Sequence, residues 1–431
     1  MAQRDPMATA DGVRGSLGAS GAAGAGSALI GTVAEWLVDQ SLGQNAIEDT
    51  FDGTCKHLNS VGVPLARGQL IFVTLHPQIS SVALTWRAGE GIGRADFSHS
   101  EVENASPQFK RSPFYHILTN NLSLMRRRLA GPAATLDFLA LEEFAAEGYT
   151  DYLACSVGFV SPASARWTHG TGILVSWATK RPGGFTDDDI ADLLRLQRRL
   201  AVACKVSIQE QITRNVLQTY LGKGASEQVL EGAIKRGDGS VEHAVIWYSD
   251  MRGSTRLAES MPSEDYLAML NTYFEITAGA VQERGGDILT FIGDAVLAIF
   301  PVPRAVPGEA CPIRNEALAA ATDALARARP VNAERLAKGL PEIRFGIALH
   351  VGDVVFGNIG IPERLSFSVI GPATNEAVRL EALTKVLDRP ILATRDFASC
   401  LPHRFEDLGS HALRGVGQPF EVLAPVLESA D

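Results

Sequence analysis

Two aspartates lie where a folded chain presents a carboxylate from the end of a rigid strand. Asp250 comes just after the apolar run Ala-Val-Ile-Trp-Tyr, and Asp294 lies between two further apolar runs. The pair Gly293-Asp294 is typical of a hairpin turn, so we expect Asp294 at the tip of two buried strands. Two carboxylates on neighbouring strands can bind two divalent cations about 3.5–4 Å apart. Taken singly, Asp250 can also be a helix N-cap and Asp294 a simple turn residue.

The residues after Asp250 are suited to phosphate. Gly253, Ser254 and Thr255 are small or polar and lead toward a predicted helix. A strand–loop–helix junction leaves backbone N–H groups free, and such groups bind phosphate oxygens well. These three residues are therefore candidate substrate-binding residues.

A second pair of polar residues lies further along the chain. Asn375 and Arg379 are four residues apart and follow Pro372, which can begin a turn leading into a helix. Residues four apart lie on one helix face. The amide can hydrogen-bond a ribose oxygen, and the planar fork of the guanidinium can stabilise charge that develops on a phosphoryl group. The structural alternative is a surface helix on which Glu376 and Arg379 form an ion pair.

Taken together, these motifs resemble the catalytic domain of class III adenylate and guanylate cyclases. The matching stretches follow the order of the family within about residues 242–427. They are Ser-Asp-Met-Arg-Gly-Ser-Thr at 249–255, Gly-Gly at 285–286, Phe-Ile-Gly-Asp-Ala-Val-Leu-Ala-Ile-Phe at 291–300, Gly-Ile-Ala-Leu-His-Val-Gly at 346–352, Gly-Asn-Ile-Gly at 357–360, and Val-Ile-Gly-Pro through Arg379 at 369–379.

The resemblance implies a ferredoxin-like βαββαβ core and a head-to-tail homodimer with shared active sites. Asp250 and Asp294 of one subunit would bind two Mg²⁺ or Mn²⁺ ions per site, with the backbone carbonyl of Met251 as a further ligand. Asn375 and Arg379 of the other subunit would be the catalytic residues. The implied reaction is in-line attack of the ribose 3′-oxygen on the α-phosphorus of a nucleoside triphosphate, with release of pyrophosphate.

Base recognition departs from the family pattern. Adenylate cyclases usually carry Lys four residues before the second metal Asp, and Asp or Thr seven residues before the transition-state Asn. Guanylate cyclases carry Glu and a small residue at these positions. Here they are Thr290 and Ser368. Hydroxyl groups can donate or accept, so they discriminate purines less firmly than a charged pair.

The resemblance therefore predicts an adenylate cyclase that acts on ATP, because the surrounding sequence is similar to bacterial adenylate cyclases. The alternatives are a guanylate cyclase and a nucleotide-binding regulatory protein with weak or no turnover. Arg414 occupies a position where many members carry a basic residue on the terminal phosphates. A solvated loop arginine is an equal alternative for it.

Composition narrows the possible partners and the location. The chain has 431 residues and a net charge of -10, which argues against nucleic acid as the main partner. Its five cysteines are scattered and form no CxxC pair, as expected of reduced thiols in a cytoplasmic protein. We find neither a signal peptide nor an apolar stretch of about 20 residues that could span a membrane.

The pattern along the chain predicts four parts. Residues 1–27 are rich in Ala and Gly and are expected to be disordered. Residues 28–185 mix strand-like runs with loops and are compatible with a GAF-like or PAS-like α/β regulatory domain, which receives an unidentified small-molecule or protein signal. Residues 186–237 form a helix and a glycine-punctuated linker, and residues 238–431 form the catalytic domain.

The helix that begins at Thr186 has an apolar seam at Ile190, Leu193, Leu196 and Leu200. One interpretation is a helix packed on its own domain. The other is a parallel dimer helix that passes a signal to the catalytic domain.

Overall fold

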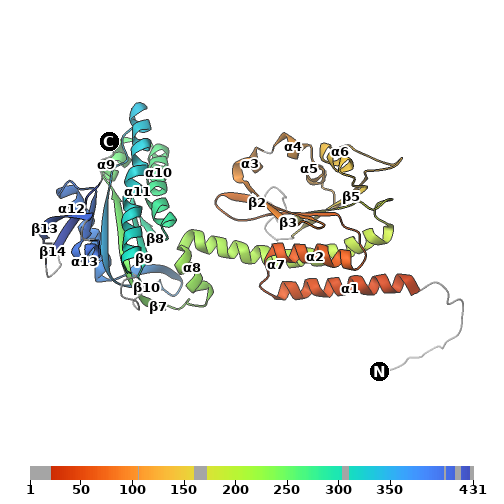
Figure 1. The fold of residues 1–431 in the computed structure, drawn as a ribbon, viewed down its shortest axis with the longest axis horizontal. Helices are drawn as coiled ribbons and strands as arrows, with labels where there is room; N and C mark the ends of the chain where they lie inside the picture. The colour runs from red at the N-terminus through yellow and green to blue at the C-terminus, as the bar shows by residue number, and fades with distance from the viewer. Residues whose placement is uncertain are drawn as a thin grey trace, which may run out of the picture. The chain divides into compact units, whose positions relative to one another are not determined.

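The computed structural model describes residues 21–104, 106–159, 172–302, 310–401, 404–412 and 419–427, and the side chains of 21–28, 310 and 311 are left out. The chain divides into two units, Met1–Val216 and Leu217–Asp431 (Figure 1). The expected disorder of residues 1–20 lies outside the described residues, whereas residues 21–27 are helical.

The first unit is built on a six-stranded antiparallel sheet with the order β3-β2-β1-β6-β5-β4. Its elements are α1 (Gly21–Leu42), α2 (Ile47–Ser60), β1 (Arg67–Val73), β2 (Ile79–Arg87), β3 (Gly91–Ser98), α3 (His99–Glu103), α4 (Pro107–Lys110), α5 (Pro113–Thr119), β4 (Leu124–Arg128), α6 (Leu139–Ala146), β5 (Asp151–Gly158), β6 (Gly172–Thr179) and α7 (Asp187–Leu221).

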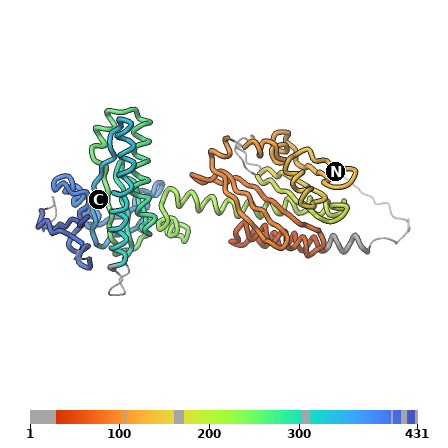
Figure 2. The backbone as a smooth tube through the Cα atoms, turned by 45° about the horizontal axis from the view of Figure 1, so that its top comes forward, coloured from red at the N-terminus to blue at the C-terminus, as the bar shows by residue number. Residues whose placement is uncertain are grey.

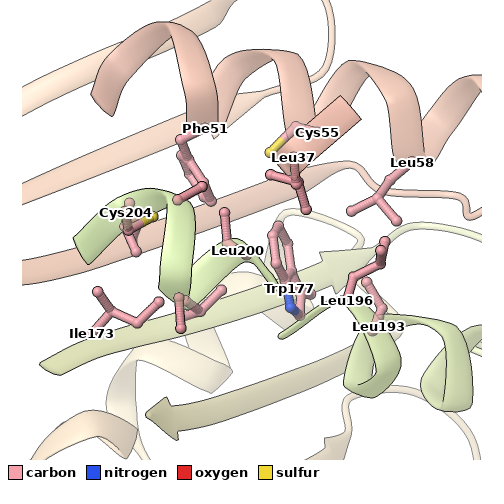
Figure 3. Close-up of a cluster of buried hydrophobic side chains, with 14 of the residues drawn as sticks. Leu37, Phe51, Cys55, Leu58, Ile173, Trp177, Leu193, Leu196, Leu200 and Cys204 are labelled. Atoms are coloured by element: carbon pink, nitrogen blue, oxygen red, sulfur yellow. The ribbon is translucent and has the colours of Figure 1, made fainter. Parts of the chain in front are cut away.

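Each face of this sheet has its own apolar core. Helices α1, α2 and α7 cover one face, where Phe51 and Trp177 have ring centroids 5.7 Å apart (Figure 3). Gly68 of β1 permits this packing, because a Cβ there would lie 3.0 Å from Cys55 Sγ and 3.1 Å from the Trp177 ring. Helices α5 and α6 cover the other face with a second cluster that includes Phe114 and Leu141.

Helix α7 packs on its own unit. Thr186 forms the N-terminal cap of this helix, with Asp189 N donating to Thr186 Oγ1 at 3.1 Å and Thr186 N donating to Asp189 Oδ2 at 2.7 Å. The seam residues Leu193, Leu196 and Leu200 are buried in the core that α1 and α2 share. The structure therefore supports the first interpretation of this seam, because these side chains are already covered.

The second unit has a sheet with the order β13-β14-β12-β10-β7-β9-β8, and β11 pairs with β10. Its elements are α8 (Lys223–Leu230), β7 (Gly239–Met251), α9 (Ser254–Ser260), α10 (Ser263–Glu283), β8 (Asp287–Ile292), β9 (Ala295–Pro301), α11 (Ala310–Ala337), β10 (Phe345–Ile361), β11 (Arg364–Ile370), α12 (Pro372–Val386), β12 (Ile391–Thr394), α13 (Arg395–Ala398), β13 (Phe405–His411) and β14 (Phe420–Pro425).

The predicted βαββαβ core is confirmed. Strands β10, β7, β9 and β8 are neighbours in that order, and each adjacent pair is antiparallel. Helices α10 and α11 run side by side on one face (Figure 2), over Trp247 and Phe345. Helix α12 packs on the other face through Ala373, Ala377 and Leu380.

The division between the units lies about twenty residues before the predicted catalytic boundary at 238. The reason is α8, which packs against β8, and whose start is fixed by Gly224 N donating to Asp287 Oδ2 at 3.1 Å. The predicted α/β class holds for both units. The GAF-like or PAS-like assignment stays a prediction. None of the helices within the described ranges is long and apolar enough to cross a membrane.

One buried carboxylate, that of Asp151, links strands β4 and β5 of the first unit to the residues just before α7. Asp151 is fully buried, and its oxygens lie 2.8 Å from Arg126 Nη2 and 3.2 Å from Arg128 Nη1. The backbone N–H of Phe185 donates to the same carboxylate at 3.0 Å. Asp187 also faces Arg126, at 3.8 Å, but its side chain is fully exposed.

We expect Asp151→Asn to lower the free energy of unfolding by about 3 kcal/mol, because it leaves two arginines without their buried partner. The control Asp187→Asn removes an exposed partner of the same Arg126. It should change the free energy of unfolding by less than about 0.5 kcal/mol. Urea unfolding followed by tryptophan fluorescence measures both, since four of the five tryptophans lie in residues 1–216. Equal effects of the two variants would contradict this account.

Candidate active site

The register of two strands brings Asp250 and Asp294 together. Asp250 lies near the end of β7, and its Cα partner on β9 is Ala295, the residue after Asp294. The backbone N–H of Met251 donates to the carbonyl of Asp294 at 3.3 Å, which holds the β8–β9 turn against the end of β7. Gly293 permits that turn with a φ of 63°. The structure thus places two carboxylates beside each other from segments about 45 residues apart.

The two carboxylates interact electrostatically. Burial raises the pKa of Asp250, and the neighbouring charge of Asp294 raises it further, whereas Lys385 lowers it. Lys385 Nζ lies 3.1 Å from Asp250 Oδ2, and the Asp250 side chain is 25% exposed. A pair of negative charges at the rim of a buried sheet is a site that attracts cations.

A third acidic residue lies beneath Asp250. Glu381 of α12 is 3% exposed, and its Oε1 accepts a hydrogen bond from Thr384 Oγ1 at 3.1 Å. Burial raises the pKa of Glu381, Lys385 lowers it, and Asp250 raises it. Gly346, the β10 partner of Asp250, makes room for it, because a Cβ there would lie 2.4 Å from Glu381 Oε1.

The loop after Asp250 turns sharply into a short helix. Gly253 has a φ of 75°, a left-handed conformation, and is the N-cap of α9. No side chain caps the first turn of α9, so the amides near Ser254 and Thr255 are not satisfied by a capping group. Arg252 anchors the loop from behind, with its Nη2 donating to the carbonyl of Thr384 at 3.0 Å.

Helix α12 carries the second predicted pair. Asn375 is exposed and Arg379 is half-buried, and neither side chain has a hydrogen-bond or ion-pair partner in the part of the chain that the structure describes. The predicted alternative, an ion pair between Glu376 and Arg379, is not formed. Glu376 instead lies 3.0 Å from the Nε2 of His350, which is 4% exposed, and this contact holds the first turns of α12 on β10.

The geometry separates Asn375 from the aspartates of its own chain. Lys385, which contacts Asp250, lies ten residues beyond Asn375 on the same helix. At a rise of 1.5 Å per residue, the two positions are about 15 Å apart along the axis. Asn375 therefore does not reach the carboxylates of the chain that carries it.

Of the remaining predicted site residues, the structure describes Thr290 and Ser368. Thr290 lies on β8, where its Oγ1 makes one long contact of 3.4 Å with the carbonyl of Phe291. Ser368 lies on β11 opposite Gly357, and β11 approaches β8. Both are partly exposed, and neither is charged. Arg414 lies outside the described residues.

Lys385, Glu381 and His350 belong to the site region and were missed from the sequence. His350 and Glu381 lie within or next to the quoted motifs, but nothing in their spacing shows that they are buried. Lys385 is six residues after Arg379, and no local pattern links it to Asp250. Only the packing of α12 across β7 and β10 brings these groups together.

The residues present fit divalent cations. Mg²⁺ is commonly bound by one or two carboxylates, with substrate phosphates supplying further oxygens. Asp250 and Asp294 supply the carboxylates, and Met251 follows Asp250 on the same strand end. Burial raises the pKa of Asp250, the charge of Asp294 raises it further, and a bound cation would stabilise the two carboxylates.

Comparison with known proteins agrees with this geometry. Residues 238–422 match the family described as adenylate and guanylate cyclase catalytic domain. Uncharacterized proteins of Mycobacterium bovis and Mycobacterium tuberculosis are 34% identical over 242 residues, which is 55% of this chain. The alignment covers 42% of those relatives, so the chain matches less than half of their length.

Solved structures of similar proteins include the guanylyl cyclase Cya2, with 28% identity and a TM-score of 0.38 over 45% of this chain and 97% of that one. The adenylyl cyclase CyaB from P. aeruginosa is 24% identical, with a TM-score of 0.38 over 45% of this chain and 98% of that one.

We expect Lys385→Gln to tighten Mn²⁺ binding about fivefold, because it removes a competing cation from Asp250 in a partly exposed pair worth about 1 kcal/mol. Titration of the free Mn²⁺ signal by electron paramagnetic resonance measures this. Lys338→Gln is the matched control, since it removes the same charge from an exposed pair with Glu334 and should leave binding unchanged. Weaker binding by Lys385→Gln would show that Lys385 does not compete with the metal.

Proposed function

Because residues 238–422 are a class III adenylate and guanylate cyclase catalytic domain, we propose that this chain is an adenylate cyclase that converts ATP to 3′,5′-cyclic AMP and pyrophosphate. The observation that carries the proposal is the placement of Asp250 beside Asp294 at the strand ends. Two carboxylates in that position bind divalent cations together with a triphosphate.

A homodimer completes the site. The side chains of Asn375 and Arg379 have no hydrogen-bond or ion-pair partners within the described part of their own chain. Asn375 lies about 15 Å along α12 from Lys385, the residue that contacts Asp250. A second copy in head-to-tail orientation would bring these two side chains to the carboxylates. Exposed apolar side chains support that contact, since Phe291 and Ile292 are 50% and 53% exposed beside Asp294, and Val378 is 38% exposed between the catalytic pair.

The residues then have distinct roles. Asp250 and Asp294 would hold two Mg²⁺ or Mn²⁺ ions, with the Met251 carbonyl, and the ions supply activation of the 3′-hydroxyl and neutralisation of the triphosphate. The backbone amides of Gly253, Ser254 and Thr255 would bind phosphate oxygens.

The partner's copies of two side chains act at the reacting group. Asn375 would orient the ribose, and Arg379 would stabilise the charge that develops on the α-phosphoryl group. Arg414 is the proposed contact to the terminal phosphates.

Thr290 and Ser368 would face the purine. ATP is the proposed substrate. GTP is the alternative, because the uncharged hydroxyls of Thr290 and Ser368 can hydrogen-bond either purine. A nucleotide-binding protein with weak turnover is the second alternative. We further propose that the first unit is a GAF-like or PAS-like regulatory domain that responds to a small molecule or a protein.

Mixing two inactive variants tests the shared site. Asp294→Asn and Asn375→Ala should each abolish formation of cyclic product, because each damages both sites of its homodimer. An equal mixture that exchanges subunits should regain about a quarter of wild-type activity, since half of the dimers hold one intact site of two. Quantifying cyclic AMP and pyrophosphate after incubation with ATP and Mn²⁺ gives the readout.

The double variant Asp294→Asn/Asn375→Ala is the matched control for mixing. Combined with wild type, it leaves every mixed dimer with two sites that each lack one residue. Exchange with an equal amount of wild type should therefore lower activity to about a quarter of wild type, carried by the wild-type dimers alone, whereas unshared sites would leave about half. A persistent absence of recovery after proven subunit exchange would show that each chain completes its own site.

A second test concerns the base. We expect wild type to prefer ATP over GTP by less than about 100-fold in kcat/KM, because neutral hydroxyls leave no buried charge unpaired with the wrong purine. Thr290→Lys with Ser368→Asp should raise the ATP:GTP ratio at least tenfold. The control Ser366→Asp introduces the same charge on β11 two residues earlier. A ratio unchanged by the double variant would show that these two positions do not face the purine.

A further inference from the structure

The first unit contains a buried arginine without a counter-ion. Arg67 is the first residue of β1 and is 7% exposed. Its Nε is buried without a hydrogen-bond partner, and within the described ranges no carboxylate lies within 4.0 Å of its guanidinium. Burial lowers the pKa of Arg67. An unpaired buried charge is costly, so such a residue usually marks a missing partner.

Aromatic rings and further polar groups surround this arginine. The Arg67 guanidinium carbon lies 4.8 Å from the ring centroid of Phe144, on α6. Nearby, Lys180 Nζ lies 4.6 Å from the ring centroid of Tyr149, which is 3% exposed. Both rings belong to the cluster that covers this face of the sheet. Two cations therefore lie over aromatic rings at the same end of the sheet.

Polar side chains continue from Arg67 along the same face. Gln69 is two residues further along β1, so it projects to the same side. Its Cα partners are Thr85 on β2 and Ser176 on β6, which places three polar side chains in a row across the sheet. The hydroxyl of Ser176 is buried, and the polar group beside it is the hydroxyl of Tyr152. Polar side chains buried in an otherwise apolar core usually have hydrogen-bonding partners.

The chain itself offers few candidates for the missing partner. Glu147 is the carboxylate that acts on Arg67 from a distance, and it is exposed at the end of α6. Arg87, directly opposite Arg67 on β2, adds a like charge. The segment 160–171, which joins β5 to β6 and is not described, contains no Asp or Glu.

We propose that Arg67 is the anchor of an anion-binding site in the first unit, which takes a small molecule that carries a carboxylate or phosphate group. Phe144 covers one side of the guanidinium, and the donors at its edge suit two acceptor oxygens of one group. Lys180 supplies a second positive charge nearby. Gln69, Thr85 and Ser176 can meet polar atoms on the rest of the ligand.

Thermal unfolding of the full chain, followed by tryptophan fluorescence, tests the site. The probes are benzoate and inorganic phosphate, with benzamide as the neutral match for benzoate and sodium chloride for ionic strength. Benzoate or phosphate should raise the Tm of the wild type, and benzamide and chloride should not. Arg67→Gln should weaken the effective anion at least tenfold, because it removes the charge and the fork of donors.

Two further variants keep the test decisive. Glu147→Gln should tighten anion binding, because it removes the competing carboxylate. If Arg67→Gln does not fold, Arg67→Lys keeps the charge without the fork and should still weaken binding of the same probe.

The proposal is overturned if neither anion raises the Tm of the wild type, or if both act equally on the wild type and the Arg67 variants. It is also overturned if Glu147→Gln destabilises the unliganded protein as much as Arg67→Gln does, since Glu147 would then be the counter-ion. Dependence of the Tm shift on Arg67 assigns the binding to the first unit, so the outcome is independent of any cyclase activity.

Discussion

The second unit is organised around two carboxylates that repel each other and are nevertheless held side by side. The antiparallel register of β7 and β9 sets Asp250 beside the β8–β9 turn, and the hydrogen bond from Met251 N to the Asp294 carbonyl fixes the turn. Both strands are buried, so the pair cannot separate without disrupting the sheet. The buried strands therefore keep the two like charges close together, and a bound cation would reduce their repulsion. In the isolated chain Lys385 fills part of that role for Asp250.

The same scaffold explains why the proposed reaction needs a second copy of the chain. Helix α12 lies across the sheet with its C-terminal end at Asp250, so its N-terminal end, with Asn375, is directed elsewhere. His350 and Glu376 hold that end on β10, and Ala373 and Ala377 bury its inner face. The helix is therefore fixed at both ends and cannot slide to bring Asn375 to the carboxylates of its own chain. A rigid α12 is compatible with the proposed reaction only if a second copy supplies the asparagine.

Much of this arrangement was predictable from the sequence, because the informative signals are local. The apolar runs and the Gly293-Asp294 turn predicted the strands around the site and the positions of Asp250 and Asp294 at their ends. Thr186 indicated the start of α7. The edge strands β3 and β4 have weak sequence signals, because the first is exposed along most of its length and the second carries three consecutive arginines. Lys385 and Glu381 were missed for another reason. Their role depends on how α12 crosses β7 and β10, and such long-range packing leaves no periodicity in the sequence.

Helix α7 shows the limit of periodicity most clearly. Its seam satisfies the spacing of a dimer helix and of a helix packed on a sheet alike, and only burial distinguishes them. Leu193, Leu196 and Leu200 are enclosed by α1 and α2, so any second copy must contact other residues of this helix. Beyond Ile208 the helix continues to Leu221 with few buried side chains, past the division between the units at Val216 and Leu217. Helix α7 is thus continuous from the core of the first unit to the start of the second. The proposed regulation by the first unit would therefore need no dimer seam along the whole helix, because the apolar seam is already buried within that unit.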